Sequence, residues 1–358
     1  MPRIESPDDS ALVELCERLA AAGTELEEAG QQGWPARQLA LCGEYGVFEW
    51  FLEPELGGQG WSDRDVIRGY LALSAACLTT TFVITQRTGA CRRLAQSENR
   101  LPAEKLLPDL VDGKSFATVG ISHLTTSRRH LARPVLRATE RPEGFVLDGF
   151  SPWVTGAPFA KHVVIGATMD DARQILVALP MDLPGVTAAE TAHLVGLTAS
   201  RTGPIHCDQL LVDRSWLLAG PIENVMQQGI GARTGGLQTS TLALGLADAA
   251  IKFLSNESTR RTDLAESAEA LREQCDAAID LLLRTADGET VCSQDEMRVA
   301  ANSLALRATQ AALAAAKGTG YVVGHPAGRW CREALFFLVW SCPQTVMEAN
   351  LCELAGLN

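Results

Sequence analysis

The chain has 358 residues, of which 46% are hydrophobic and 21% charged, and its formal net charge is −12. This balance is typical of a globular protein with two or three packed subdomains, and it argues against a disordered chain. The negative charge repels nucleic acid and anionic membranes, so we expect neither as a partner. The N-terminus has no apolar segment typical of a signal peptide, and we expect a cytoplasmic protein.

Ten cysteines are spread along the chain. No two of them have the CxxC spacing of a zinc or thioredoxin-like site, so we expect no metal. Most stand among apolar neighbours, which favours buried free thiols in a reducing compartment over a disulfide framework.

The N-terminal third, residues 1–115, is predicted to be helical. Ser10 is expected to cap a first helix whose apolar positions repeat at helical spacing. A second helical segment covers about 36–46. A Gly/Pro-rich loop at 53–62 follows, and Ser62 at its end is predicted to cap the next helix.

From about Phe116 the hydrophobic period changes to that of strands. Short apolar segments bounded by turn residues predict strands at 145–149, 162–166, 174–179 and 209–212. We interpret the region from 116 to 218 as a small β-domain, a barrel or sandwich.

The last part of the chain, 219–358, returns to a helical pattern. Long helices are predicted at 237–254, 265–284 and 296–317, and the last of these is rich in alanine, the strongest helix former. Separate blocks of helices and strands favour an α+β fold. The predicted domains are an N-terminal helical domain (1–115), a middle β-domain (116–218) and a C-terminal helical bundle (219–358).

Four motifs stand in the order and with the spacing of a known family. They are EPELGGQG at 53–60, FVLDGFSPWVTGAPFA at 145–160, ALGLA at 243–247, and GTGY at 318–321 followed by Pro326 and REA at 332–334. Together they resemble the acyl-CoA dehydrogenase family along nearly the whole chain. The resemblance implies that family's fold, with FAD held between the β-domain and the C-terminal bundle.

The resemblance also implies flavin contacts in the β-domain. Trp153 matches an aromatic residue that covers the flavin, and Thr155 matches a hydroxyl that bonds the flavin N5 edge. An indole shields the isoalloxazine and a short alcohol gives a fixed hydrogen bond, although Trp153 could also be a plain core aromatic. Ser122 matches a hydroxyl at the flavin pyrimidine edge. The loop after it departs from the family pattern, and Ser127 is a candidate to replace a serine lost there.

Further cofactor and substrate contacts are implied elsewhere. Arg261, or its neighbour Arg260, matches an arginine that binds the FAD pyrophosphate of an adjacent subunit, since a guanidinium suits a diphosphate; a solvated charge at a helix end is the alternative. The glycines of the GTGY motif, Gly318 and Gly320, allow close approach of a dinucleotide to the backbone. The family is commonly tetrameric, and we expect a homo-oligomer, either a dimer or a homotetramer.

The dense basic group of the β-domain follows the flavin loop. Arg128 and Arg129 in it are candidates to hold the phosphate of CoA or of an acyl carrier against the negative charge of the protein. A solvated loop is the alternative.

The catalytic base of the family is missing from its usual place. Removal of an α-proton requires a carboxylate within hydrogen-bond reach of the α-carbon. The family glutamate lies nine residues after the arginine that corresponds to Arg332, which here gives Ser341; a small insertion would place Gln344 there instead. The second family position, on the first long C-terminal helix, falls on 235–236, a pair of glycines.

Three functions therefore stay open. The first is an oxidoreductase of acyl thioesters, or of a related small organic substrate, with an unconventional base. The second is a flavin-dependent monooxygenase of the same fold, in which His123 and Ser341 could serve the hydroperoxide or the substrate. The third is a non-catalytic flavoprotein. The nearby Glu333 and Glu348 are interpreted as a salt-bridge partner and a surface residue.

Overall fold

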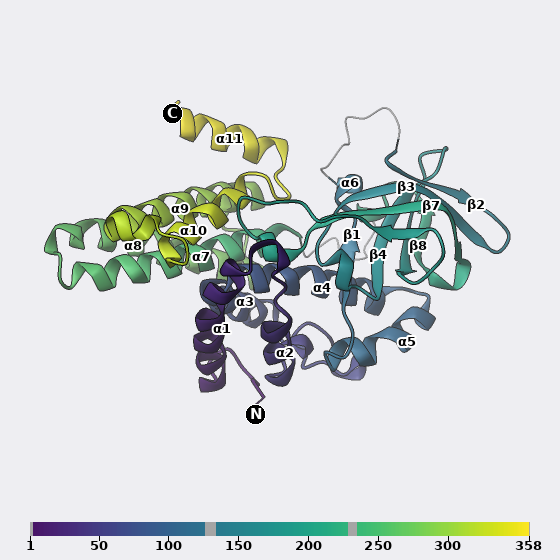
Figure 1. Cartoon of the computed structure of the whole chain (residues 1–358), viewed down its shortest axis with the longest axis horizontal. Helices are drawn as coiled ribbons and strands as arrows, with labels where there is room; N and C mark the ends of the chain where they lie inside the picture. Colours follow the sequence, from purple (N-terminus) through teal and green to yellow (C-terminus); the bar gives the residue numbers. More distant parts are fainter. Residues whose placement is uncertain (1–2, 126–133, 228–234, 358) are drawn as a thin grey trace.

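The computed structural model describes residues 3–125, 134–227 and 235–357. Figure 1 shows the sheet at one end of the molecule, the long C-terminal helices at the other, and the N-terminal helices along one side of both. The predicted α+β fold, with helices, then a sheet, then helices, is confirmed.

The segment before the first strand is helical, as predicted. Its α-helices are α1 (Ser10–Glu28), α2 (Ala36–Glu44), α3 (Asp63–Ala76), α4 (Leu78–Gln96) and α5 (Arg100–Val111). Ser62 caps α3, and its hydroxyl accepts a hydrogen bond of 3.1 Å from the backbone N–H of Asp65. The predicted cap of α1 is wrong by one residue. Asp9 accepts from the backbone N–H of Ala11 at 2.9 Å, and Ser10 is the first helical residue.

The β-domain is one mixed sheet. Its strands are β1 (Ala117–Gly120), β2 (Leu136–Glu140), β3 (Gly144–Val154), β4 (His162–Thr168), β5 (Gln174–Pro180), β6 (Val186–Ala188), β7 (Gly203–Asp213) and β8 (Leu217–Ile222). The strand order is β6-β7-β3-β2-β4-β5-β8, and β1 pairs with β4 in parallel. The four predicted strands lie within β3, β4, β5 and β7. The sheet continues past residue 218, because β8 ends at Ile222.

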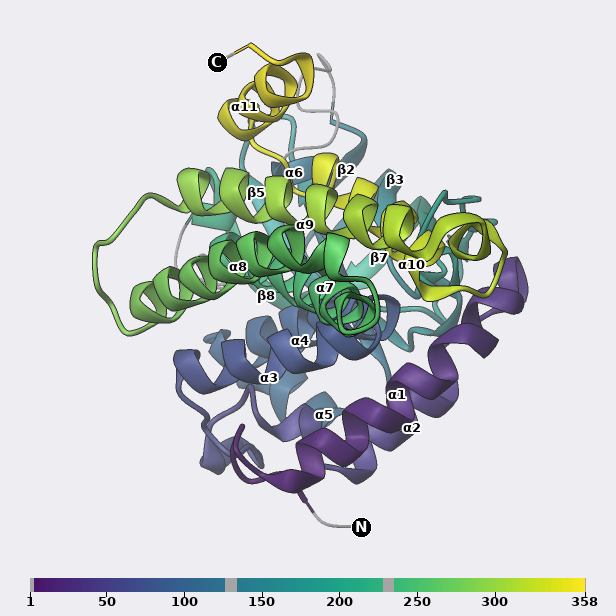
Figure 2. The same cartoon turned by 90° about the vertical axis from the view of Figure 1, so that its left-hand side faces the viewer.

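The C-terminal helices form a bundle around α7. They are α7 (Gly235–Ser258), α8 (Ala265–Ala286), α9 (Gln294–Ala316), α10 (Pro326–Ala334) and α11 (Gln344–Ala355). Figure 2 shows α7 between α9 on one side and the pair α3 and α4 on the other. Gly245 permits this approach, because a Cβ there would lie 2.7 Å from the carbonyl oxygen of Leu71 on α3. The three predicted helices of this region lie within α7, α8 and α9, apart from the last residue of the third.

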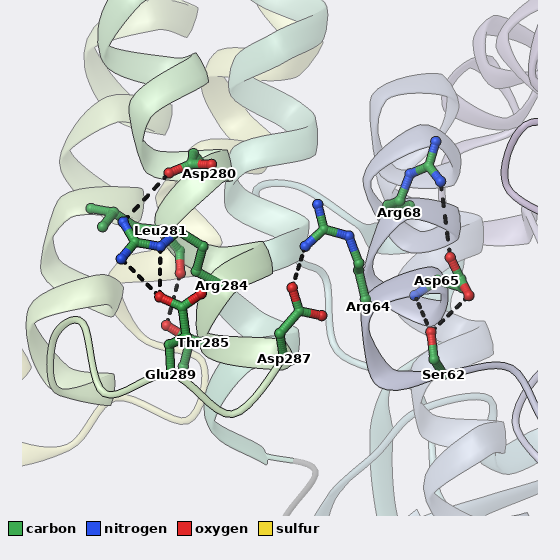
Figure 3. A network of polar contacts seen from close by, with 10 residues as sticks. All are labelled: Ser62, Arg64, Asp65, Arg68, Asp280, Leu281, Arg284, Thr285, Asp287 and Glu289. Atoms are coloured by element: carbon green, nitrogen blue, oxygen red, sulfur yellow. Dashed lines mark hydrogen bonds and ion pairs between the residues drawn. The ribbon is translucent and has the colours of Figure 1, made fainter.

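The helices at both ends of the chain share one hydrophobic core, while the sheet has a core of its own. Polar contacts also cross the interface between the N-terminal and the C-terminal helices. Arg64 near the start of α3 pairs with Asp287 at the end of α8, and Figure 3 shows this pair between two local networks of side chains. The N-terminal helices and the C-terminal bundle therefore pack around one common core.

Within these ranges no helix is both long and apolar enough to cross a membrane. The same residues contain no group of three or more His, Cys, Asp or Glu side chains arranged to hold a metal ion.

Candidate functional site

The end of β3 presents an aromatic face. The strand alternation turns the side chain of Val154 inward, where it is fully buried, and the indole of Trp153 outward, where 48% of the residue is exposed. Thr155 follows directly and is 3% exposed. A large exposed indole next to a buried hydroxyl offers a flat apolar surface with a polar contact at its edge. The structure thus places both predicted residues at the end of β3, with the indole exposed and the hydroxyl buried.

Two residues that the sequence did not single out support Thr155. Its Oγ1 lies 3.0 Å from Oγ1 of Thr202, which lies 2.8 Å from Oγ of Ser200. The backbone N–H of Gly156 donates to the carbonyl oxygen of Ser200 at 2.9 Å. Small hydroxyl residues in a loop are common turn formers, so the sequence carried no signal for this role.

Ser122 is the first residue of the short helix α6 (Ser122–Thr125), which begins one residue past the end of β1. Its hydroxyl oxygen is buried and has no hydrogen-bond partner among the described residues. A buried hydroxyl without a partner costs about 1–3 kcal/mol. A ligand with a polar edge would remove this cost, so Ser122 fits the proposed flavin contact.

The neighbouring His123 is fixed inside the β-domain. Its Nε2 lies 2.8 Å from the carbonyl oxygen of Gly166, so this nitrogen carries the proton and donates it. Nδ1 then accepts from the hydroxyl of Ser151 at 3.5 Å. Burial lowers the pKa of His123, which favours the neutral ring. Both ring nitrogens face the protein, which differs from the expectation that His123 serves a substrate.

Three predicted residues of the following loop, Ser127, Arg128 and Arg129, lie outside the described residues.

A second group of predicted cofactor residues gathers at the far end of the bundle. Arg261 Nη1 donates to the carbonyl oxygen of Ala315 at 2.7 Å, and its Nη2 lies 3.4 Å from Asp263. Arg261 is thus close to the turn Lys317–Tyr321, which holds Gly318 and Gly320.

Gly318 and Gly320 differ in how closely the rest of the chain packs against them. At Gly320 a Cβ would lie 2.7 Å from that of Ala316, so packing within the chain requires glycine there. A Cβ on Gly318 would meet no atom within 4 Å. Packing within this chain therefore gives no reason for glycine at 318.

The position of Arg261 is set by the long helix α7. Helix α7 begins on the side of the β-domain and ends three residues before Arg261 (Figure 1). With 24 residues, it is about 36 Å long at a rise of about 1.5 Å per residue. Arg261 therefore stands just beyond the C-terminal end of α7.

The two places where the family carries its base hold no carboxylate. Ser341 is exposed and its backbone is left-handed, with φ of 47°. Gln344 is exposed and its amide donates to Glu348 at 2.7 Å. The second place, 235–236, is the first turn of α7 and has no side chains.

Glu333 lies in a different environment. It is 3% exposed, 3.8 Å from Arg329 and 3.4 Å from the hydroxyl of Thr79. Burial raises its pKa. A cavity of about 300 Å³ lies beside it, at the junction of α1, α4, α10 and the loop before β7.

No family model matches the chain. Its sequence is similar to the probable acyl-CoA dehydrogenase YngJ of Bacillus subtilis (strain 168), at 24% identity over 233 residues, which cover 63% of this chain and 61% of that protein. The match therefore spans less than two thirds of that relative. The sequence is also similar to the mitochondrial short-chain specific acyl-CoA dehydrogenase of Mus musculus, at 22% identity over 327 residues, 84% of this chain and 78% of that protein.

Solved structures share the fold along the whole chain. Butyryl-CoA dehydrogenase from Megasphaera elsdenii superposes with a TM-score of 0.81 at 18% identity, covering 97% of each chain. KijD3, in complex with FMN and a dTDP-linked amino-keto sugar, superposes with a TM-score of 0.73 at 20% identity, covering 99% of this chain and 96% of that chain. The likeness confirms the predicted fold.

Proposed function

We propose, since the chain is acyl-CoA dehydrogenase-like in sequence and fold, that it is an FAD-dependent oxidoreductase acting on an acyl thioester or a related small organic substrate. The observation that supports the cofactor most directly is the buried hydroxyl of Ser122, which has no partner in the described chain. It stands in the same domain as the exposed indole of Trp153 and the hydroxyl of Thr155.

Three side chains would hold the flavin. Trp153 would cover one face of the ring system and exclude water from it. Thr155 would form a hydrogen bond at the N5 edge, and Ser122 would form one at the pyrimidine edge. When bound, the flavin supplies the redox chemistry, as an acceptor of hydride or, once reduced, as a donor of electrons to oxygen.

The removal of the substrate α-proton is the step for which this chain lacks the carboxylate of the family pattern. Neither Ser341 nor Gln344 can accept a proton at neutral pH as a carboxylate does. A flavin-dependent monooxygenase needs no such base, and this second candidate is favoured by the lack of a carboxylate at Ser341, at Gln344 and at 235–236. A non-catalytic flavoprotein is the third candidate.

Anaerobic titration of the FAD-loaded protein with a panel of acyl-CoAs distinguishes these functions. Bleaching of the flavin absorbance by at least one thioester is expected for the dehydrogenase. No bleaching, followed by oxygen-dependent product formation with added reductant, would replace it with the monooxygenase. If the protein shows neither bleaching nor product formation, the non-catalytic flavoprotein is the function that remains.

We also propose that the protein is a homo-oligomer, a dimer or a tetramer. The family resemblance assigns Arg261 to the pyrophosphate of a cofactor that is held by another copy. Helix α11 packs with one face against α9, whereas Leu351 and Leu354 on it are 57% and 60% exposed. Such a surface is suited to burial against a second copy.

The ten cysteines are all free thiols, which supports the reducing cytoplasm as the location of the protein.

A further inference from the structure

The loop before α2 carries an indole that contacts the β-domain. Trp34 lies between the turn Gly30–Gln32 and the start of α2. Its ring is stacked on that of Phe159, with ring centroids 4.3 Å apart and planes inclined by 12°. It also meets the ring of Phe116 in an edge contact, at 5.3 Å and 76°. Ring contacts of these two geometries stabilise beyond the area that they bury, so the N-terminal loop is bound to the β-domain here.

Both contacts lie at the turn that follows Thr155. Gly156 is the next residue, and its backbone is left-handed with φ of 66°. A Cβ on Gly156 would lie 2.6 Å from Cε1 of Phe116 and 2.8 Å from Cη2 of Trp34. The two rings therefore pack directly against the backbone one residue past Thr155. Glycine suits both this conformation and this close approach.

The same turn is bound to the segment before β7. The backbone N–H of Gly156 donates to the carbonyl oxygen of Ser200 at 2.9 Å. This segment also packs on the N-terminal loop, since a Cβ on Gly33 would lie 3.1 Å from that of Ala199. Ala199 belongs to the hydrophobic core of the helices. The residue after Thr155 is thus enclosed by the N-terminal loop and by the segment before β7.

We propose that Trp34 is a positioning residue of the flavin site, which fixes the hydroxyl of Thr155 by enclosing the turn after it. This inference rests on the proposed function, in which Thr155 bonds the flavin. Before Thr155 the chain is fixed by the sheet, because Val154 pairs with Gly203 of β7. After Thr155 the chain leaves the sheet, and the packing around Gly156 holds it. A binding group has to be held within about 0.5 Å of its productive position, so both sides of Thr155 matter.

Removal of the indole should therefore act through Thr155. In Trp34→Ala the ring contacts are lost and the turn gains room, which weakens the hydrogen bond between Thr155 and the flavin. We expect FAD affinity to fall about fivefold, as for the loss of one neutral hydrogen bond, and the absorbance spectrum of the bound flavin to change. In the Thr155→Val background that hydrogen bond is already absent. Trp34→Ala should there change the affinity by less than about twofold.

The test is a double-mutant cycle of Trp34→Ala and Thr155→Val, followed by FAD affinity, flavin absorbance and urea unfolding of the apoprotein. Trp61→Ala is the matched control, because Trp61 is stacked on Trp50 of the N-terminal domain at 4.2 Å and 9°. It should lower the free energy of unfolding and leave FAD affinity and absorbance at parental values. If Trp34→Ala does not fold, Phe159→Ala replaces it in the cycle, because Phe159 is 41% exposed and provides the other ring of the stack.

Three results would overturn the role of Trp34 and leave the proposed function standing. They are parental FAD affinity in Trp34→Ala, an equal loss of affinity with and without Thr155→Val, and an equally large loss in Trp61→Ala. The last would trace the effect to general destabilisation. A correctly folded parent that takes up no FAD would refute the proposed function, and the inference with it.

Discussion

Arg298 donates a hydrogen bond of 2.6 Å to the carbonyl oxygen of Trp340, one residue before the position where the family carries its base. Arg298 lies on α9, is 5% exposed, and also donates to the side-chain oxygen of Asn302 at 3.0 Å. Asn302 in turn donates to the carbonyl oxygen of Phe337 at 3.0 Å. These buried polar groups hold the segment before Ser341 against α9.

Removal of this arginine should destabilise the protein. Arg298→Met leaves the carbonyl oxygen of Trp340 without its donor, and we expect the free energy of unfolding to fall by about 2–3 kcal/mol. Urea unfolding measures the change. Arg307→Met, on the exposed face of the same helix, is the matched control and should change it by less than about 0.5 kcal/mol. Equal effects of the two substitutions would show that Arg298 does not hold this segment.

Glu333 should make stability depend on pH. Burial raises its pKa above the ordinary value of 4.5, so between pH 4.5 and the raised pKa the folded state binds more protons than the unfolded state. Its contribution to stability is fully present below pH 4.5 and is lost as pH rises through the raised pKa. In Glu333→Gln this slope should be absent, so the variant gains stability relative to the parent as pH rises.

Chemical denaturation at a series of pH values above 4.5 tests this. Glu348→Gln, an exposed glutamate of α11, is the control and should follow the parent. Parallel curves for the parent and Glu333→Gln would mean that Glu333 is ionised in the folded protein as readily as in the unfolded one.

Helix α11 should contribute to self-association. Leu351→Glu places a charge on its exposed apolar surface, which is costly to bury, and should shift the protein toward smaller species in size-exclusion chromatography with light scattering. Val13, which is 61% exposed on α1, provides the control Val13→Glu, which should retain the parental mass. A monomeric parent would contradict the proposed oligomer.

Trp153 should matter for flavin binding more than for folding. Because 48% of the residue is exposed, Trp153→Leu should change the free energy of unfolding of the apoprotein by no more than about 1 kcal/mol. The loss of the indole should weaken FAD binding by at least about tenfold, or about 1.4 kcal/mol. Leu211→Ala, at a residue of β7 that is 47% exposed, is the control for both measurements. Unchanged FAD affinity would remove Trp153 from the site.

Local sequence patterns predicted much of the fold, because hydrophobic residues repeat at a regular spacing in long helices and form short continuous runs in buried strands. The alanine-rich segment of α9 and the strand pair β4 and β5 are examples. Strand β1 was missed because it has four residues, all of them buried, and its pairing with β4 is set by contacts distant in sequence. The sequence does not distinguish Ser10 from Asp9 as the cap of α1, because both residue types suit that position.

The site was predictable only where it lies on a motif. Trp153 and Thr155 stand in one continuous segment, whereas Thr202 and Ser200 reach Thr155 only through the pairing of β3 with β7. The contact of Arg298 with Trp340 joins residues 42 positions apart. Neither carries a local signal, since which polar side chains meet inside a fold is decided by tertiary packing.

Flavin uptake by the purified chain tests the central claim most directly. The apoprotein is titrated with FAD and, separately, with FMN, and binding is followed by flavin fluorescence and absorbance. The account predicts a yellow protein that binds one FAD per chain and binds it more tightly than FMN. A correctly folded chain that remains colourless and takes up neither flavin would contradict it.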